Sequence, residues 1–240
     1  IKRNQSFGTS DINIFEIGKV YVQDSPGELR EELRVAGAIA GNMWQSKWNL
    51  PSEALDTDFY LCKGIIESVL DSLGIAGANY VQTTEPMLHP TRSAAIMVSS
   101  RQIGVIGEAS PSVRETLDLR ERPCVYDLDF NALMELTPKV LKYHHLHKYP
   151  ALHRHLAVVI PNEVKYSDLT RVIEESDRGV IESITLLDVY TGEQVGNGRS
   201  SITVSIVFRS AQKTLTDDEV NCVLEKVKDA LTQQLGATFR

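Results

Sequence analysis

A histidine-rich run in the middle of the chain is the first place where residue types and spacing could do chemistry. His144, His145 and His147 stand close to His153 and His155, and imidazoles are common metal ligands. A metal site, however, needs three or four ligands that converge with a defined geometry. Consecutive histidines in a polar segment point into water, so we expect no metal ligands here.

No familiar catalytic motif occurs in the sequence. The chain lacks the GxSxG nucleophile elbow, the HExxH zinc motif and the phosphate-binding patterns GxxxxGK[ST] and GxGxxG. Glu85, His89 and Arg92 stand close together, but a loop fixed by Pro86 and Pro90 gives them a structural role, which we favour. We therefore predict no catalytic residues. The three cysteines form no CxxC pair and are expected to be reduced thiols.

The most informative candidates are Asp188 and Tyr190, at the end of a predicted strand over residues 181–190. Residues two apart on a strand share a face. If Asp188 is not buried, a carboxylate and an aromatic ring lie together on an open sheet face, where they could hydrogen-bond to a base and stack on it. Leu186 and Leu187 are both apolar, so parity does not orient the strand. An ordinary Asp and Tyr at a sheet end is an equally good interpretation from spacing alone.

The elements around this pair follow the order β-α-β-β-α-β. Thr216 and Glu219 have the spacing of a capping box at the start of the last helix, and Gly236 is placed to end it. That order specifies a ferredoxin-like sandwich with four strands on one side and two helices on the other. The strands are predicted at 152–160, 181–190, 201–209 and 237–240, and the first helix at 167–176.

The first half of the chain has mixed helical and strand patterns. A helix over 58–73 is predicted from its apolar face, and a shorter one over 131–136. Strands are predicted at 13–22, 33–40, 80–84, 94–99, 102–107 and 124–130. The basic, histidine-rich segment 138–150 lies between prolines and separates the two patterns, so we expect two domains, residues 1–147 and 148–240.

Composition limits what kind of partner the chain can have. It holds 42% apolar and 24% charged residues, which is typical of a soluble globular protein and excludes disorder. The formal charge is −7, whereas a protein that holds nucleic acid by bulk electrostatics should be basic. Any RNA contact must therefore be local. No apolar run is long enough to cross a membrane. Because the chain begins at Ile1 without a methionine, we expect it to be an excised part of a longer one.

Taken together, these segments resemble the C-terminal part of the bacterial phenylalanyl-tRNA synthetase beta subunit. In the second half, the segments similar to its ferredoxin-fold anticodon-binding domain are 149–159, 187–192, 196–201, 208–220 and 236–240. In the first half, the segments similar to its catalytic-like domain are 15–21, 58–64, 89–94 and 103–108. The chain departs from the family pattern at Thr91, Ser110 and His155, where a glycine, a histidine-proline pair and an acidic residue are usual.

The resemblance implies an α+β protein: an incomplete class II synthetase-like antiparallel sheet domain, followed by a ferredoxin-like βαββαβ sandwich. It implies a subunit of a cytoplasmic ligase that charges tRNA with phenylalanine. ATP, phenylalanine and Mg²⁺ would bind to the alpha subunit, and this part would bind no cofactor. The first domain would pack against alpha in a heterotetramer of two alpha and two beta chains. The second would contact tRNA, with no membrane or DNA partner.

The resemblance also assigns roles to individual residues. The family's Asp-x-Tyr segment lies at the anticodon, which gives Asp188 and Tyr190 a tRNA-binding role and extends it to Ser201. Arg199 and Arg209 are the nearby candidates for phosphate contacts. An alternative from another functional class is a regulatory, ferredoxin-like module that senses small molecules and is attached to an α+β domain. The acidic composition also suits that alternative.

Overall fold

The computed structural model describes residues 1–25, 27–42, 57–140, 147–192 and 195–239. The chain forms two compact units, Ile1–Lys142 and Tyr143–Arg240, and each is described by itself. The domain boundary at residues 147/148 stays a prediction, because residues 141–146 of the expected connection lie outside the described residues. His144 and His145 lie outside them as well.

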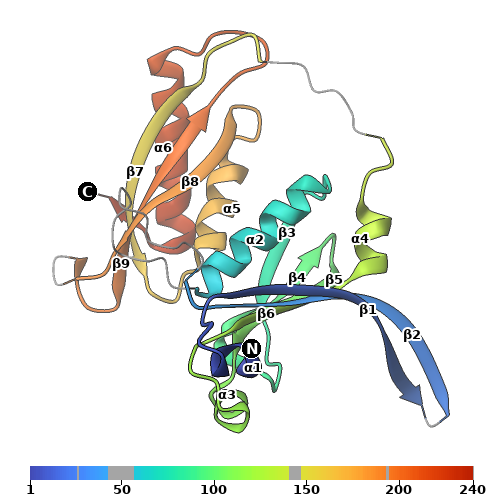
Figure 1. Cartoon of the computed structure of the whole chain (residues 1–240). Coiled ribbons are helices and arrows are strands. Elements are labelled where there is room, and N and C mark those ends of the chain that lie inside the picture. Colours follow the sequence, from blue (N-terminus) through green and yellow to red (C-terminus); the bar gives the residue numbers. More distant parts are fainter. Residues whose placement is uncertain (26, 43–56, 141–146, 193–194, 240) are drawn as a thin grey trace. The chain divides into compact units, whose positions relative to one another are not determined.

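A six-stranded antiparallel sheet forms the centre of the first unit, with the strand order β1-β2-β6-β5-β4-β3 (Figure 1). The strands are β1 (Ile12–Ser25), β2 (Glu28–Ala40), β3 (Ala78–Gln82), β4 (Leu88–Val98), β5 (Arg101–Ala109) and β6 (Cys124–Asp129). The helices are α1 (Lys2–Ser6), α2 (Phe59–Ser72), α3 (Pro111–Leu117) and α4 (Phe130–Leu136). The antiparallel sheet domain expected from the sequence is confirmed.

Helix α2 packs on one face of this sheet because its apolar residues recur every four positions. Cys62, Ile66 and Leu70 are buried against Ile96 and Ile106 of the sheet. Asp58 caps the helix by accepting a hydrogen bond from the backbone N–H of Leu61 at 2.8 Å.

All three cysteines of the chain are free. A hydrogen bond to Cys62, together with burial, raises the pKa of the Cys124 thiol.

Helix α3 was missed from the sequence, although its start carries a recognised signal. Ser110 accepts a hydrogen bond from the backbone N–H of Val113, and Pro111 occupies the first turn. Ser110 is therefore the N-cap of α3.

His89 and Arg92 take part in two separate contacts of the first unit. The Arg92 guanidinium donates to the carboxylate of Glu108, which is buried, at 2.8 Å. The imidazole Nδ1 of His89 accepts from the backbone N–H of Thr91 at 3.3 Å. The Arg92–Glu108 contact joins β4 to β5, whereas the His89–Thr91 contact stays within β4. The structural role of Glu85, His89 and Arg92 stays a prediction.

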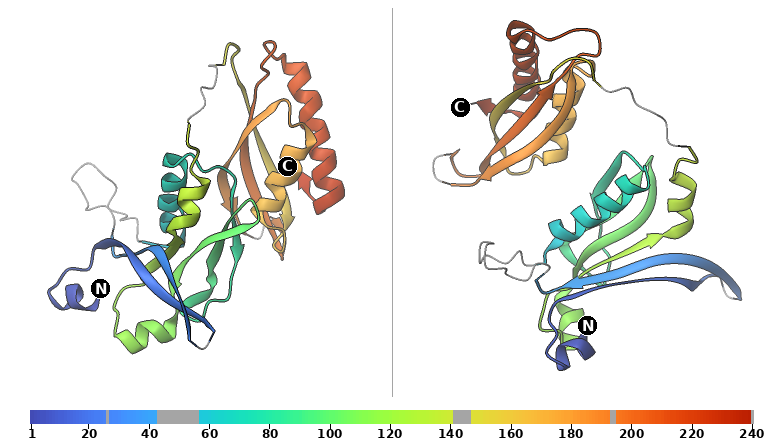
Figure 2. Two further views of the ribbon diagram at one scale, coloured as in Figure 1. Left: turned by 90° about the vertical axis from the view of Figure 1, so that its right-hand side faces the viewer. Right: turned by 45° about the horizontal axis from the view of Figure 1, so that its top comes forward.

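The second unit has the predicted βαββαβ order and the sheet order β10-β7-β9-β8. Its elements are β7 (Leu152–Pro161), α5 (Tyr166–Ser176), β8 (Ile181–Tyr190), β9 (Arg199–Phe208), α6 (Asp217–Leu235) and β10 (Thr238–Phe239). The capping box of Thr216 and Glu219 is present, and Gly236 ends α6 with a φ of 61°. Figure 2 shows both helices on one side of the four-stranded sheet.

The core of this unit lies between the sheet and its two helices. Alternate residues of β9, namely Ile202, Val204, Ile206 and Phe208, are buried against apolar residues of α5 and α6. The opposite parity therefore faces away from the helices. No helix in the described part of the chain is long and apolar enough to span a bilayer.

Candidate nucleic-acid interface

The face of the four-stranded sheet that lies opposite α5 and α6 is called the open face below. Cross-strand partners in an antiparallel sheet share a face, so the β9 residues Ser201, Thr203, Ser205 and Val207 define it. Their partners on β7 are Val159, Ala157, His155 and His153. Their partners on β8 are Tyr190, Asp188, Thr185 and Ser183.

A β-bulge at Leu187 decides which way the end of β8 faces. Leu186 pairs with Val204 and Asp188 pairs with Thr203, so Leu187 is an extra residue without a partner of its own. A bulge of this kind shifts the side-chain alternation by one position. Leu186 consequently falls on the helix side, whereas Asp188 and Tyr190 fall on the open face. This explains why the apolar residues of β8 occupy both parities.

Asp188 and Tyr190 are accessible on this face, and Ser201 is not. Asp188 is exposed, and 42% of the Tyr190 surface is exposed. The Tyr190 ring lies against Gly192, where an added Cβ would come within 2.4 Å of the phenol oxygen. Ser201 pairs with Tyr190 but is buried between it and Val159 on β7. The structure thus places Asp188 and Tyr190 on the same face, as predicted. Ser201 lies on that face too, but its side chain is buried.

The two arginines predicted to contact phosphate are engaged in contacts within the unit. One Arg199 Nη donates to the carbonyl oxygens of Val159 at 3.1 Å and Gly236 at 2.8 Å. Arg209 donates to the Glu182 carboxylate at 2.8 Å and to the backbone carbonyl of Tyr149 at 3.1 Å. Both guanidinium groups therefore hold the ends of the sheet together.

Sequence reasoning did not place His153 and His155 on the open face. Both imidazoles are exposed, opposite Val207 and Ser205. The sequence places both in the predicted strand 152–160 and predicts no metal site for them. Within the described ranges, no three His, Cys, Asp or Glu side chains gather closely enough to hold a metal ion. Their two-residue spacing on a strand, with Arg154 between them, was the signal that could have placed them on one face.

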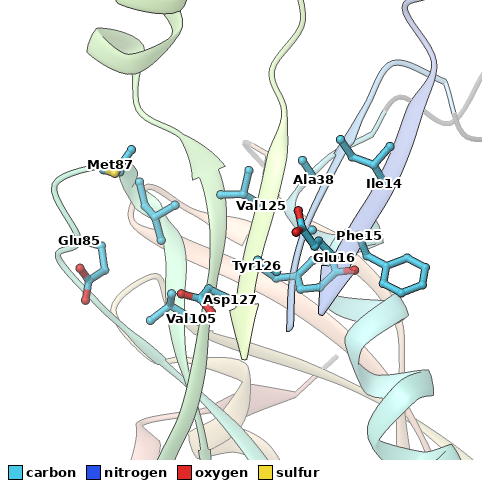
Figure 3. A pocket seen from close by; sticks show the side chains of 13 residues that line it. Ile14, Phe15, Glu16, Ala38, Glu85, Met87, Val105, Val125, Tyr126 and Asp127 are labelled. Atoms are coloured by element: carbon cyan, nitrogen blue, oxygen red, sulfur yellow. The ribbon is translucent and has the colours of Figure 1, made fainter. Parts of the chain in front are cut away.

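The first unit carries a groove of about 530 Å³ on its sheet (Figure 3). Its floor consists of small apolar side chains of β2, β5 and β6: Ala36, Ala38, Val105 and Val125. Three carboxylates, Glu16, Glu85 and Asp127, line it as well. The described lining residues include no lysine, arginine or histidine. The Asp127 carboxylate is paired with the Arg34 guanidinium at 2.9 Å, so its charge is balanced from outside the groove lining.

Each half of the chain matches a known protein family. Residues 1–130 match the family described as "Phenylalanyl tRNA synthetase beta chain CLM domain". The chain belongs to this family. Residues 147–240 match the "Ferredoxin-fold anticodon binding domain", which agrees with the βαββαβ order of the second unit. The family resemblance inferred from the sequence is thereby confirmed.

Curated relatives of the beta chain family cover the whole of this sequence. The chain is 36% identical over 99% of its length to the phenylalanine–tRNA ligase beta subunit of Moorella thermoacetica. It is 35% identical over its full length to that of Symbiobacterium thermophilum. It spans 29% and 27% of those two proteins. The crystal structure of pyrrolysyl-tRNA synthetase from Desulfitobacterium hafniense covers 59% of this chain and 50% of its own, with a TM-score of 0.42 and 14% identity.

Proposed function

We propose that this chain is a non-catalytic part of a phenylalanine–tRNA ligase beta subunit, and that it binds the anticodon region of tRNA through the open face. The observation that carries the proposal is the position of Asp188 and Tyr190. They lie together and accessible on the helix-free face of a domain that matches the anticodon-binding family. The whole enzyme would charge tRNA with phenylalanine in the cytoplasm.

The chemistry of the open face suits single-stranded RNA. An aromatic ring such as that of Tyr190 stacks on an unpaired base of any type. The Asp188 carboxylate repels phosphate but accepts hydrogen bonds from base N–H groups, which makes it a specificity element. The hydroxyls of Thr185, Thr203 and Ser205 add neutral donors and acceptors along the same face.

The tRNA contact would assist catalysis through placement alone. When the anticodon is held on this face, the acceptor end of the same tRNA stays in register with a distant active site. That active site, with ATP, phenylalanine and Mg²⁺, would belong to the alpha subunit.

The first unit would serve as a scaffold that packs against alpha in a heterotetramer of two alpha and two beta chains. Large apolar side chains are exposed on the β1–β2 hairpin, among them Phe15, Tyr21 and Leu29. Exposed apolar groups that recur along one element are typical of a surface that another chain covers. We therefore expect this hairpin to contribute to the subunit contact.

Two measurements test the proposal. We expect the chain to co-elute with a phenylalanyl-tRNA synthetase alpha subunit and to catalyse no phenylalanine-dependent ATP–pyrophosphate exchange by itself. Exchange that survives rigorous removal of endogenous synthetase would contradict the non-catalytic assignment. A ligand that binds the folded state raises its thermal midpoint, so tRNA should shift the midpoint and free amino acids should not. A shift with amino acids alone would favour the small-molecule-sensing alternative.

A further inference from the structure

We infer that His153 and His155 are the anion-binding residues of the open face, and that in their protonated form they contact the phosphate backbone of the bound RNA. The inference rests on the proposed function, because it concerns the same face. Its consequence is that RNA affinity depends on pH, with tighter binding as the pH falls from 8 to 6.

The register places the two imidazoles side by side on one face. His153 pairs with Val207 and His155 pairs with Ser205, and both histidines are exposed. The next strand, β8, continues these rows with Ser183 and Thr185. Short side chains around both rings leave them accessible to a strand of RNA that crosses the sheet.

The three arginines of these strands make contacts elsewhere in the unit. Arg154, between them on β7, belongs to the helix side and forms an ion pair with Asp217 at the start of α6. Arg199 and Arg209, at the ends of β9, are bonded to carbonyl and carboxylate oxygens within the unit. Arg199 keeps its charge, since its partners are neutral carbonyls, but it pairs with Pro161, at the opposite end of β9 from the partners of the two histidines. Near Val207 and Ser205, as far as the strands are described, the exposed imidazoles are the groups that a phosphate could meet.

The groups that face the two histidines are neutral. Val207 and Ser205 of β9 and Ser183 and Thr185 of β8 carry no charge. The nearest carboxylate at that end of β8, Glu182, is bonded to Arg209 and to His147, the latter at 3.3 Å. Asp188 lies towards the other end of the face, opposite Thr203. Histidine is the side chain whose charge ordinarily changes between pH 5 and 8, which is the range that the test below spans.

The test uses the full 240-residue chain and a fluorescently labelled anticodon stem–loop RNA. Anisotropy titrations at pH 6 and pH 8, each over a series of salt concentrations, give the affinity and its salt dependence. The variants are His153→Gln/His155→Gln, which removes the charge, and His153→Lys/His155→Lys, which keeps it at both pH values. His147→Gln is the matched control, because His147 is paired with Glu182. Thermal midpoints confirm that each variant is folded.

We expect the unaltered chain and His147→Gln to bind roughly tenfold more tightly at pH 6 than at pH 8, since an exposed ion pair contributes about two- to fivefold and there are two. The glutamine variant should bind weakly at both pH values. At pH 6 its slope of log affinity against log salt should be shallower by about 1.4, which corresponds to two phosphate contacts on single-stranded nucleic acid. The lysine variant should bind tightly at both.

Two outcomes overturn the inference and leave the proposed function intact. One is a glutamine variant that keeps the pH dependence and salt slope of the unaltered chain, while Tyr190→Ala still weakens binding. The other is a lysine variant as weak as the glutamine variant, because positive charge would then not be what the RNA requires. If the unaltered chain binds no RNA at either pH, the proposed function itself is refuted.

Discussion

Replacing Tyr190 with alanine is the most direct perturbation of the open face. The ring stands at the end of β8 with 42% of the residue exposed, and one side of it lies against Gly192. Alanine removes the whole aromatic surface and leaves Asp188 unchanged. Because the residue ends an edge strand and is not in the core, the loss of stability should not exceed about 1 kcal/mol, the full range of strand propensities.

The loss of affinity can be worked out from the accessible part of the ring. Stacking of one base on an aromatic side chain contributes about 1–3 kcal/mol when measured by alanine substitution. Because Tyr190 is 42% exposed, part of its surface is already covered within the unit, and we expect the lower part of that range. A loss of about 1–2 kcal/mol corresponds to a roughly 5- to 30-fold weaker tRNA affinity.

The assay is a tRNA titration of the chain assembled with an alpha subunit, together with ATP–pyrophosphate exchange. Tyr190→Phe should keep the affinity, because it keeps the ring. Val189→Ala is the matched control: Val189 is the neighbouring exposed residue, but it pairs with Ile202 and so belongs to the helix side. Exchange should be unchanged in all three variants. If Tyr190→Ala folds normally and binds tRNA as tightly as Val189→Ala, the assignment of this face is wrong.

Further predictions concern specificity, stability and domain organisation. Asp188→Asn should change tRNA affinity little but reduce discrimination between anticodon variants, measured by competition; unchanged discrimination would remove Asp188 from the site. Phe208→Ala opens a cavity in the fully buried core of the second unit and should cost about 3–5 kcal/mol in chemical denaturation. Gly37→Ala places a Cβ 2.3 Å from the Tyr126 ring and should destabilise the first unit by about 1–3 kcal/mol; a neutral result would show that the ring moves aside freely. Limited proteolysis should cut first within residues 138–148 and leave a resistant fragment that contains Asp188, whereas early cleavage within β8 or β9 would contradict the predicted boundary.

Much of the second unit could be predicted because its signals are local. The alternation of Ile202, Val204 and Ile206 identifies a strand with one buried face, whatever the rest of the chain does. The capping box of Thr216 and Glu219 needs contacts only between neighbouring residues, and it forms as expected. Each strand and helix of this unit can be predicted in this way, and their order along the chain then predicts the ferredoxin-like sandwich.

The orientation of β8 could not be predicted from its own sequence. Its apolar residues allowed either face, and pairing with β9 decided between them through the bulge at Leu187. A bulge is a property of two strands, since the extra residue exists only relative to a partner. The same holds for the sheet order of the first unit, in which β2 pairs with β6 more than eighty positions away.

For the arginines and histidines of the second unit, too, the residue type is known from the sequence but the contacts of the side chain are not. Arg199 and Arg209 have the composition of phosphate ligands, yet carbonyl and carboxylate oxygens from distant segments hold them. His153 and His155 resemble a polar run in sequence, yet strand pairing places them on the open face. The sequence by itself determined most of the elements, because periodicity and capping depend on near neighbours, and its ordered motifs determined the family. The tertiary structure decided which way the end of β8 faces and where these arginine and histidine side chains lie, because both depend on hydrogen-bond register and on partners brought from elsewhere in the chain.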